Sequence, residues 1–290
     1  MEEKQKKRTA LIMEGGAMRG LFTCGIIDVF LEQNITFDAA AGISAGAIFG
    51  INYKSRQIGR PLRYNLRFCR DPRYGTLTSF LKSGDLYDAD FCYRVVPELL
   101  DVFDAEAYRK NPMKFYAGVT NAYTGKAEYR CCDEWNDYDA GWVQASGSMP
   151  VVSKPVQVGG KLLLDGGIAD SVMFRYMEGL GYNRNVIILT RPAGYRKQNS
   201  RLLPLMKAAL HDYPEVYEAM KRRPEIYNRQ MEEIEEREKR GECLVMRPKE
   251  DLGVRRNEHD PKELQRVYDI GRNEALERLE EVRKFLNQSE

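Results

Sequence analysis

The sequence predicts an α/β fold, in which short buried strands alternate with helices around a central sheet. Residues 9–13, TALIM, form a strand pattern that runs through Glu14 into a glycine-rich turn and then into the apolar helical stretch LFTCGIIDVFLEQ. Residues 37–46, FDAAAGISAG, repeat the same order of strand, turn and helix start. Residues 185–192, NVIILTRP, add a further buried strand. This alternation is typical of α/β proteins.

The remaining patterns extend the fold and divide the chain in two. We expect helices over residues 87–103, 139–149, 202–210 and 226–240, two strands within 115–130, strands around 155–167, and a final amphipathic helix over 262–286. The character of the chain changes beyond residue 191, where helices dominate. We therefore expect a main domain over residues 1–195 and a helical C-terminal extension over 196–290, whose late strand at 243–247 joins the main sheet.

The pentapeptide Gly42-Ile43-Ser44-Ala45-Gly46 places a serine between a predicted strand and a predicted helix. In a GxSxG elbow, glycines on both sides of the serine let the two backbones approach closely while the hydroxyl projects outward. Unpaired amides and the positive dipole end at the helix start favour a developing serinate. Ser44 is therefore a candidate nucleophile, with Gly42 and Gly46 as the elbow glycines. The pentapeptide alone fits a plain helix cap equally well.

A second glycine-rich turn, Gly15-Gly16-Ala17-Met18-Arg19-Gly20, follows the first predicted strand. Consecutive backbone amides without bulky side chains suit an oxyanion site for acyl transfer. They also suit a phosphate, but the dinucleotide fingerprint GxGxxG requires a glycine where this chain has Ala17. We therefore favour an oxyanion loop formed by Gly15, Gly16, Ala17 and Arg19, in which Arg19 either contacts a phosphate of the substrate or braces the loop.

Asp165 ends the strand pattern KLLLDGG and is the candidate base for Ser44. Asp-Gly-Gly is by itself usually a turn, but a serine nucleophile needs a positioned base, and the chain has only two histidines, His211 and His259. Ser44, Asp165 and His259 satisfy the residue order of an α/β-hydrolase triad. Such folds place several strands before the elbow, whereas one strand and one helix fit before residue 37. A direct dyad of Ser44 and Asp165 is therefore the favoured interpretation.

Four motifs in this order resemble the patatin-like phospholipases, and within them the bacterial cytoplasmic group with a C-terminal helical extension. They are Gly15-Gly16-Ala17-Met18-Arg19-Gly20, Gly42-Ile43-Ser44-Ala45-Gly46, Ala145-Ser146-Gly147-Ser148-Met149-Pro150 and Asp165-Gly166-Gly167. The resemblance implies a three-layer α/β/α fold with a mostly parallel sheet, a catalytic domain over residues 1–195, Ser44 as nucleophile and Asp165 as base. It implies a cofactor-free phospholipase A or lysophospholipase-like hydrolase of lipid esters. Competing interpretations are a Ser-Asp-His triad esterase and a catalytically silent protein that binds a lipid or a nucleotide.

Ala17 departs from the family pattern, which carries a third glycine in its oxyanion loop. If residue 17 must adopt a positive φ angle, the methyl group of alanine strains the backbone. The amide of Ala17 still donates a hydrogen bond. We therefore expect an oxyanion hole that is retained but altered.

Composition limits the class of partner. The formal net charge is +2, and the chain outside residues 54–73 is not basic, which argues against nucleic acid as a partner. No run approaches the ~20 apolar residues that span a bilayer. The six cysteines show no CxxC pairing. Reduced thiols, no metal site and a cytoplasmic location are the expectations that follow.

Arginines gather in residues 54–73, which follow the nucleophile helix. Arg63, Arg67 and Arg70 are spaced to fall on one face of a helix. There they could meet anionic lipid headgroups near the site and bring the protein into peripheral contact with a membrane. The alternative is a solvated helix face that is paired with acids elsewhere.

Overall fold

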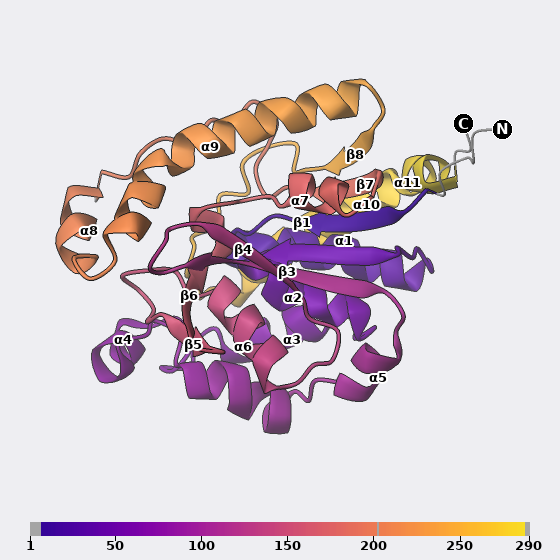
Figure 1. Ribbon diagram of the computed structural model, residues 1–290. Helices are drawn as coiled ribbons and strands as arrows, with labels where there is room; N and C mark the ends of the chain where they lie inside the picture. The colour runs from indigo at the N-terminus through magenta and orange to yellow at the C-terminus, as the bar shows by residue number, and fades with distance from the viewer. Residues whose placement is uncertain (1–6, 202, 288–290) are drawn as a thin grey trace.

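A mixed eight-stranded sheet forms the centre of the computed structural model, which describes residues 7–201 and 203–287 (Figure 1). The strands are β1 (Thr9–Met13), β2 (Ala39–Ile43), β3 (Lys114–Asn121), β4 (Ala127–Cys131), β5 (Val156–Val158), β6 (Lys161–Asp165), β7 (Arg184–Ile188) and β8 (Cys243–Met246). Their order is β5-β6-β3-β2-β1-β7-β8, and β4 also pairs with β3. The strands β3-β2-β1-β7-β8 run parallel, whereas β4, β5 and β6 pair antiparallel. The predicted α/β fold is confirmed.

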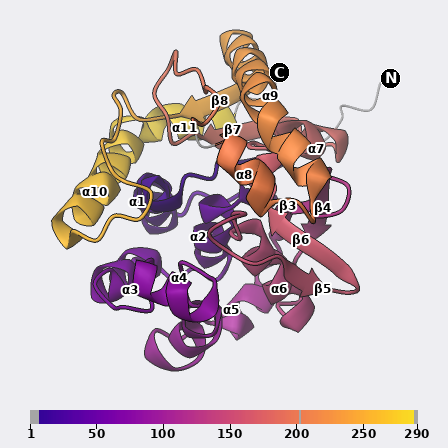
Figure 2. The ribbon, with the colours of Figure 1, turned by 90° about the vertical axis from the view of Figure 1, so that its left-hand side faces the viewer.

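Helices cover both faces of the sheet (Figures 1 and 2). One face packs against α1 (Gly20–Glu32), α2 (Ala45–Lys54), α3 (Arg60–Phe68), α6 (Asp137–Ser146), α10 (Pro261–Glu277) and α11 (Leu279–Asn287). The other packs against α7 (Phe174–Gly179) and α9 (Pro214–Lys239). Shorter elements are η1 (Ala17–Arg19), α4 (Leu77–Ser83), the π-helix η2 (Phe91–Leu100), α5 (Ala105–Lys110), η3 (Gly166–Ile168) and α8 (Leu203–Ala209). The three-layer α/β/α architecture is thus confirmed.

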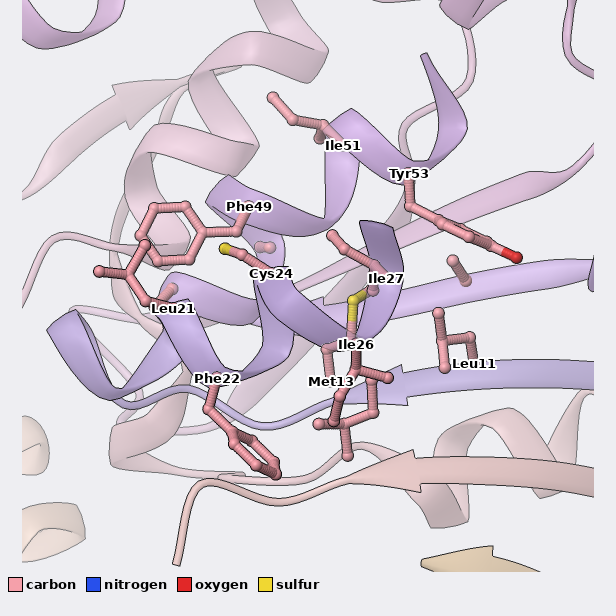
Figure 3. Packing of buried hydrophobic residues seen from close by; sticks show 14 of the residues in the cluster. Leu11, Met13, Leu21, Phe22, Cys24, Ile26, Ile27, Phe49, Ile51 and Tyr53 are labelled. Atoms are coloured by element: carbon pink, nitrogen blue, oxygen red, sulfur yellow. The ribbon is translucent and has the colours of Figure 1, made fainter. Parts of the chain in front are cut away.

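The alternation of side chains along β1 divides the core between the two faces. Leu11 and Met13 point toward α1, where they join Phe22 in the larger apolar cluster (Figure 3). Ala10 and Ile12 belong to the cluster on the opposite face, with side chains of α7 and α9. All four of these β1 side chains are fully buried. A strand that is buried on both faces reads as a continuous apolar run, which is why TALIM predicted an internal strand.

The C-terminal part of the chain shares the core of the sheet domain. β8 extends the sheet beside β7, α9 covers one face, and α10 packs on α1 (Figure 1). A Cβ atom on Gly25 would lie closer than 3.0 Å to the backbone of Tyr268, and one on Gly271 would lie as close to that of Phe22. α1 and α10 therefore meet backbone to backbone, and the Tyr268 hydroxyl donates a 2.8 Å hydrogen bond to buried Asp28. The boundary at residue 195 stays a prediction.

Several helix bounds differ from those predicted. α9 begins at Pro214 instead of residue 226 and continues through Pro224. A proline suits the first helical turn, and one in a long helix removes a single backbone hydrogen bond. The predicted last helix is divided into α10 and α11 at Arg278, whose backbone (φ −106°, ψ 13°) leaves the helical range. Residue 202, the first of the predicted helix 202–210, lies outside the described residues.

Candidate active site

Ser44 occupies the turn between β2 and α2 in a conformation that few residues adopt. Its φ is 56° and its ψ is −124°. A Cβ atom on Gly42 would lie closer than 3.0 Å to the backbone of Gly46, and one on Gly46 would lie as close to the carbonyl of Met13. Only glycine fits on the two sides of the serine. The predicted elbow geometry is present in the structure.

Strand pairing brings Ser44 and Asp165 together. Ile43, at the end of β2, pairs with Gly118 of β3, and Asp165, at the end of β6, pairs with the next β3 residue, Val119. Ser44 Oγ donates a 2.6 Å hydrogen bond to Asp165 Oδ2. The Ser44 side chain makes no capping hydrogen bond to α2, so the helix-cap alternative is wrong.

Asp165 is held in a buried, hydrogen-bonded position. Its Oδ1 accepts a 2.7 Å hydrogen bond from the Gly167 amide, and the residue is 2% exposed. Burial raises the pKa of the Asp165 carboxyl above its ordinary value, while the hydrogen bond from Ser44 and the nearby Arg223 guanidinium act in the opposite direction. A raised pKa makes this carboxylate a stronger base than a solvated aspartate.

Ser146, on α6, braces the elbow from behind. The Ser44 amide donates a 2.9 Å hydrogen bond to Ser146 Oγ. Ser146 Oγ in turn donates a 2.7 Å hydrogen bond to the carbonyl of Gly118. This fully buried hydroxyl therefore links the elbow to β3. Ser146 belongs to the third sequence motif, which associated it with the site. The residue types of that motif do not by themselves predict that Ser146 braces the elbow.

The glycine-rich loop after β1 lies directly against Ser44. A Cβ atom on Gly15 would lie 2.7 Å from the Ser44 Cβ atom. Glu14 fixes the loop, because its Oε2 accepts a 2.6 Å hydrogen bond from the Thr190 amide. The amides of Gly16 and Ala17 donate no hydrogen bond to another residue in the described part of the chain. They are free to serve as oxyanion donors.

Ala17 adopts a positive backbone φ angle, the conformation in which an alanine is strained. Its φ is 50°. A left-handed conformation costs an alanine roughly 1–2 kcal/mol relative to its favoured regions. The loop keeps this conformation because its neighbours hold it, for example through the 3.1 Å hydrogen bond from the Arg19 amide to the Gly16 carbonyl. Strain of this kind is characteristic of functional loops.

The two histidines lie apart from the dyad. His259 Nδ1 contacts the carbonyl oxygen of Cys69, and His211 contacts the carbonyl of Ala208 and the side chain of Asp212. Both Asp165 oxygens are already engaged by Ser44 and by a backbone amide. The arrangement therefore gives the triad interpretation no support. Within residues 7–201 and 203–287, no group of side chains is suited to hold a metal ion.

A cavity of about 1760 Å³ opens onto the dyad. Its floor contains Ser44, Asp165 and the glycine-rich loop. An apolar wall is formed by side chains that include Ile48, Phe49, Tyr64, Tyr93, Val96 and Phe103. Another part is lined by basic side chains, which we call the basic cluster: Arg19, Arg191, Lys197, Arg223 and Arg256. A cavity lined by both apolar and charged side chains suits an amphipathic molecule.

The arginines predicted for headgroup binding lie elsewhere. α3 ends at Phe68, so Arg70 falls in the following turn and does not share a helix face with Arg63 and Arg67. Arg63 donates two hydrogen bonds, of 2.7 and 2.8 Å, to the carboxylate of Asp101. Arg67 donates to the carbonyl of Leu100, and none of the three arginines lines the cavity. The prediction that all three arginines share one helix face is wrong, because periodicity was extended beyond the end of the helix.

The side chain of Arg19 lines the cavity instead of bracing its own loop. Its Nε atom is buried and has no hydrogen-bond partner in the described chain. Sequence reasoning identified this residue but missed the four other members of the basic cluster. Those four are scattered between residues 191 and 256 and form no motif. Only the fold brings them beside the glycine-rich loop.

The family model described as patatin-like phospholipase matches residues 11–177, more than half of the chain. The chain therefore belongs to the patatin-like phospholipase family. Membership supports hydrolysis of lipid acyl esters as the class of activity. A second family model, described as a domain of unknown function (DUF6363), matches residues 213–287, which contain α9, β8, α10 and α11.

Among curated relatives, the chain is similar to the uncharacterized protein YjjU of Escherichia coli, with 26% identity over 65% of this chain and 54% of that protein. It is 25% identical to lysophospholipase nte1 of Aspergillus niger over 60% of this chain and 11% of that protein. The chain thus spans about half of the first relative and a small part of the second. The crystal structure of VipD from Legionella pneumophila aligns over 95% of this chain and 67% of that chain, with 14% identity and a TM-score of 0.46.

Proposed function

We propose that this protein is a serine acyl hydrolase of lipid esters that uses Ser44 as nucleophile and Asp165 as base. The observation that carries the proposal is the 2.6 Å hydrogen bond from Ser44 Oγ to Asp165 Oδ2 at the floor of the cavity. The strained backbone at Ser44 and the free amides of Gly16 and Ala17 support it. The name lysophospholipase of the Aspergillus relatives supports a phospholipase A or lysophospholipase-like reaction.

The reaction proceeds in two halves. Asp165 accepts the hydroxyl proton as Ser44 Oγ attacks the ester carbonyl, and the amides of Gly16 and Ala17 stabilise the oxyanion. The ester C–O bond then breaks, and the protonated Asp165 gives its proton to the departing alcohol. In the second half Asp165 takes a proton from water, which attacks the acyl-enzyme. The fatty acid leaves, and Ser44 regains its proton from Asp165.

The cavity accommodates both ends of a lipid ester. The apolar wall, with Phe49, Tyr64 and Val96 among its side chains, offers a dry surface for an acyl chain. The basic cluster lies beside the glycine-rich loop and the dyad, as the proximity of Arg223 to Gly167 shows. An ester carbon above Ser44 would therefore lie in a cavity that offers both apolar and charged side chains. This combination fits a phospholipid or lysophospholipid better than a small polar ester.

Labelling by a fluorophosphonate probe tests the nucleophile. The intact protein is expected to become labelled, and Ser44→Ala is expected to lose the label, because the probe reacts with activated serines. Ser153→Ala, at another serine of the cavity, serves as the matched control and should keep the label. Mass spectrometry of the labelled peptide gives the site. A folded intact protein that takes no label would instead support the catalytically silent binding protein.

Contact with a membrane surface is part of the proposal. Leu77 and Leu81 on α4 are 68% and 77% exposed. The chain after α4 joins the cavity rim, where the Leu86 amide donates a 2.8 Å hydrogen bond to the carbonyl of Val152. Figure 2 shows α4 and α8 on the face turned toward the viewer. Among the helices of the described residues, none combines the length and the apolar character that a membrane span requires.

Sedimentation with phospholipid vesicles measures this contact. The double variant Leu77→Ser, Leu81→Ser should lower the vesicle-bound fraction, because each leucine loses roughly 1.5–3 kcal/mol of apolar burial in the membrane interface. Leu276→Ser, at an exposed leucine of α10, is the matched control. Equal vesicle binding of the double variant and the intact protein would show that α4 does not contribute to membrane contact.

A further inference from the structure

The basic cluster joins residues from parts of the chain that no sequence motif connects. Arg19 belongs to the glycine-rich loop, Arg191 and Lys197 follow β7, Arg223 lies on α9, and Arg256 lies between β8 and α10. All but Arg19 lie beyond the region matched by the patatin-like model, and two lie within the domain of unknown function. The C-terminal part therefore supplies a charged wall to the active-site cavity.

Positive charge in this wall exceeds the negative charge around it. Arg191 pairs with Asp251. The other four cations of the basic cluster form no ion pair in the described chain. Glu14, Asp165 and Asp251 are the carboxylates beside these five cations. The Nε atoms of Arg19 and Arg223 are buried without a hydrogen-bond partner in the described chain. These groups are arranged to receive an acceptor that the protein itself does not provide.

Burial and, to a smaller extent, mutual repulsion lower the pKa of cations in the cluster. Burial, followed by the neighbouring Arg223, lowers the pKa of Lys197 to about 7. Burial also lowers the pKa of Arg19, with Arg191 as the next cause. An anionic group placed among these side chains would offset both effects and favour the protonated lysine.

The position of Arg223 connects the cluster to the dyad. A Cβ atom on Gly167 would lie 3.2 Å from Arg223 Nη2, and the amide of Gly167 donates to Asp165 Oδ1. A ligand group bound by Arg223 would thus be separated by only a few covalent bonds from an ester of the same ligand placed at Ser44. The glycerol of a phospholipid provides such a spacing between its phosphate and its ester.

We propose that the basic cluster binds the phosphate monoester headgroup of an anionic lipid, and that the C-terminal part of the chain thereby sets the substrate preference of the active site. A phosphate monoester carries close to two negative charges at neutral pH and offers several acceptor oxygens to arginine. A phosphocholine headgroup carries one, together with a positive charge that the cluster would repel. The proposal rests on the hydrolase function proposed above.

The test compares two lipids with the same acyl chain, palmitoyl lysophosphatidic acid and palmitoyl lysophosphatidylcholine. The intact protein is expected to hydrolyse the monoester with a kcat/KM higher by roughly 10- to 100-fold, the size of a charged hydrogen bond gained or lost. Arg256→Gln and Arg223→Gln should each lower this preference roughly tenfold. The neighbouring surface residues give matched controls, Arg255→Gln and Arg222→Gln, which should keep it. Equal hydrolysis of both lipids by the intact protein would overturn the proposal.

Two further measurements separate headgroup binding from effects on the base. Arg223 lowers the pKa of Asp165, so Arg223→Gln should move the acid limb of kcat/KM for p-nitrophenyl butyrate to higher pH. Arg256→Gln should leave that limb in place, because Arg223 and Lys197 are the cations that lower the pKa of Asp165. A loss of preference in Arg223→Gln alone, together with the moved limb, would make the cluster a positioning device and overturn headgroup binding.

Failure of this inference differs from failure of the proposed function. If p-nitrophenyl butyrate is hydrolysed without a headgroup preference, only the inference fails. If no ester is hydrolysed, calorimetric titration with glycerol 3-phosphate still tests the cluster, and binding should be lost in Arg256→Gln. Inorganic phosphate is expected to bind more weakly than glycerol 3-phosphate. Equal binding of the two would assign the cluster to free phosphate, and no binding of either would leave it without a ligand; both results overturn the proposal.

Discussion

Asp165→Asn is expected to lower kcat/KM for p-nitrophenyl butyrate by roughly 10²- to 10⁴-fold, the usual contribution of a general base. The asparagine amide can keep the hydrogen bond from Gly167 through its oxygen, but it cannot take the proton of Ser44. The loss corresponds to about 3–5 kcal/mol in the activation free energy. Steady-state kinetics measure it, and thermal unfolding shows whether the variant remains folded.

The role of Asp165 as a base also predicts how activity depends on pH. Burial raises the pKa of Asp165, and only the ionised carboxylate accepts a proton. Activity of the intact protein should therefore fall as the pH drops through that raised pKa, above the range of an ordinary aspartate near 3.9. His259→Ala is the control and should keep both rate and profile, since His259 contacts Cys69. Loss of activity in His259→Ala, with native-like activity in Asp165→Asn, would restore the triad.

Gly271→Ala is expected to destabilise the protein by roughly 3–5 kcal/mol, in the range reserved for severe core disruption. The added methyl group would lie closer than 3.0 Å to the carbonyl of Phe22, which belongs to the backbone of α1 and cannot move aside as a side chain can. α10 would have to shift away from α1, and the hydrogen bond between Tyr268 and Asp28 would be lost with it. Urea unfolding followed by circular dichroism measures the change.

Gly179→Ala provides the comparison for this substitution. Gly179 ends α7, and a Cβ atom there would meet no heavy atom within 4 Å. Its replacement should change the free energy of unfolding by no more than about 1 kcal/mol, the difference in helix propensity. If Gly271→Ala unfolds at the same urea concentration as the intact protein, the close approach of α1 and α10 does not hold in solution.

Local motifs explain why the positions of Ser44 and Asp165 in turns, and the layered fold, were predictable. The elbow around Ser44 and the triplet at Asp165 each occupy a few consecutive residues whose types are dictated by a turn. The alternation of buried strands and helices needs no long-range information either. The motifs did not identify the residue that acts as base for Ser44. The direct contact between Ser44 and Asp165 was inferred from the lack of a suitable histidine and depends on the pairing of β2 and β6 with β3.

The charged surroundings of the site could not be predicted in this way. Arg63 and Arg67 fit a helical pattern, yet their partners lie 38 and 33 residues further along the chain, beyond the reach of local periodicity. The members of the basic cluster come from loops and from α9, and each one looks like an ordinary surface residue in sequence. Lys197 and Arg256, for example, have no apolar periodic neighbours that mark them as inward-facing. Their role depends on tertiary structure alone.

The shared use of β3 has a consequence for how this chemistry can be lost. Side chains along a strand alternate between faces, so sliding β6 by a single position would present Leu164 to the serine and turn the carboxylate away. Substitutions within β3 that disturb this alignment would abolish the proposed activity while leaving Ser44 and Asp165 themselves unchanged. A natural variant that keeps both the serine and the aspartate would therefore still be inactive if the pairing of β2 and β6 with β3 were altered.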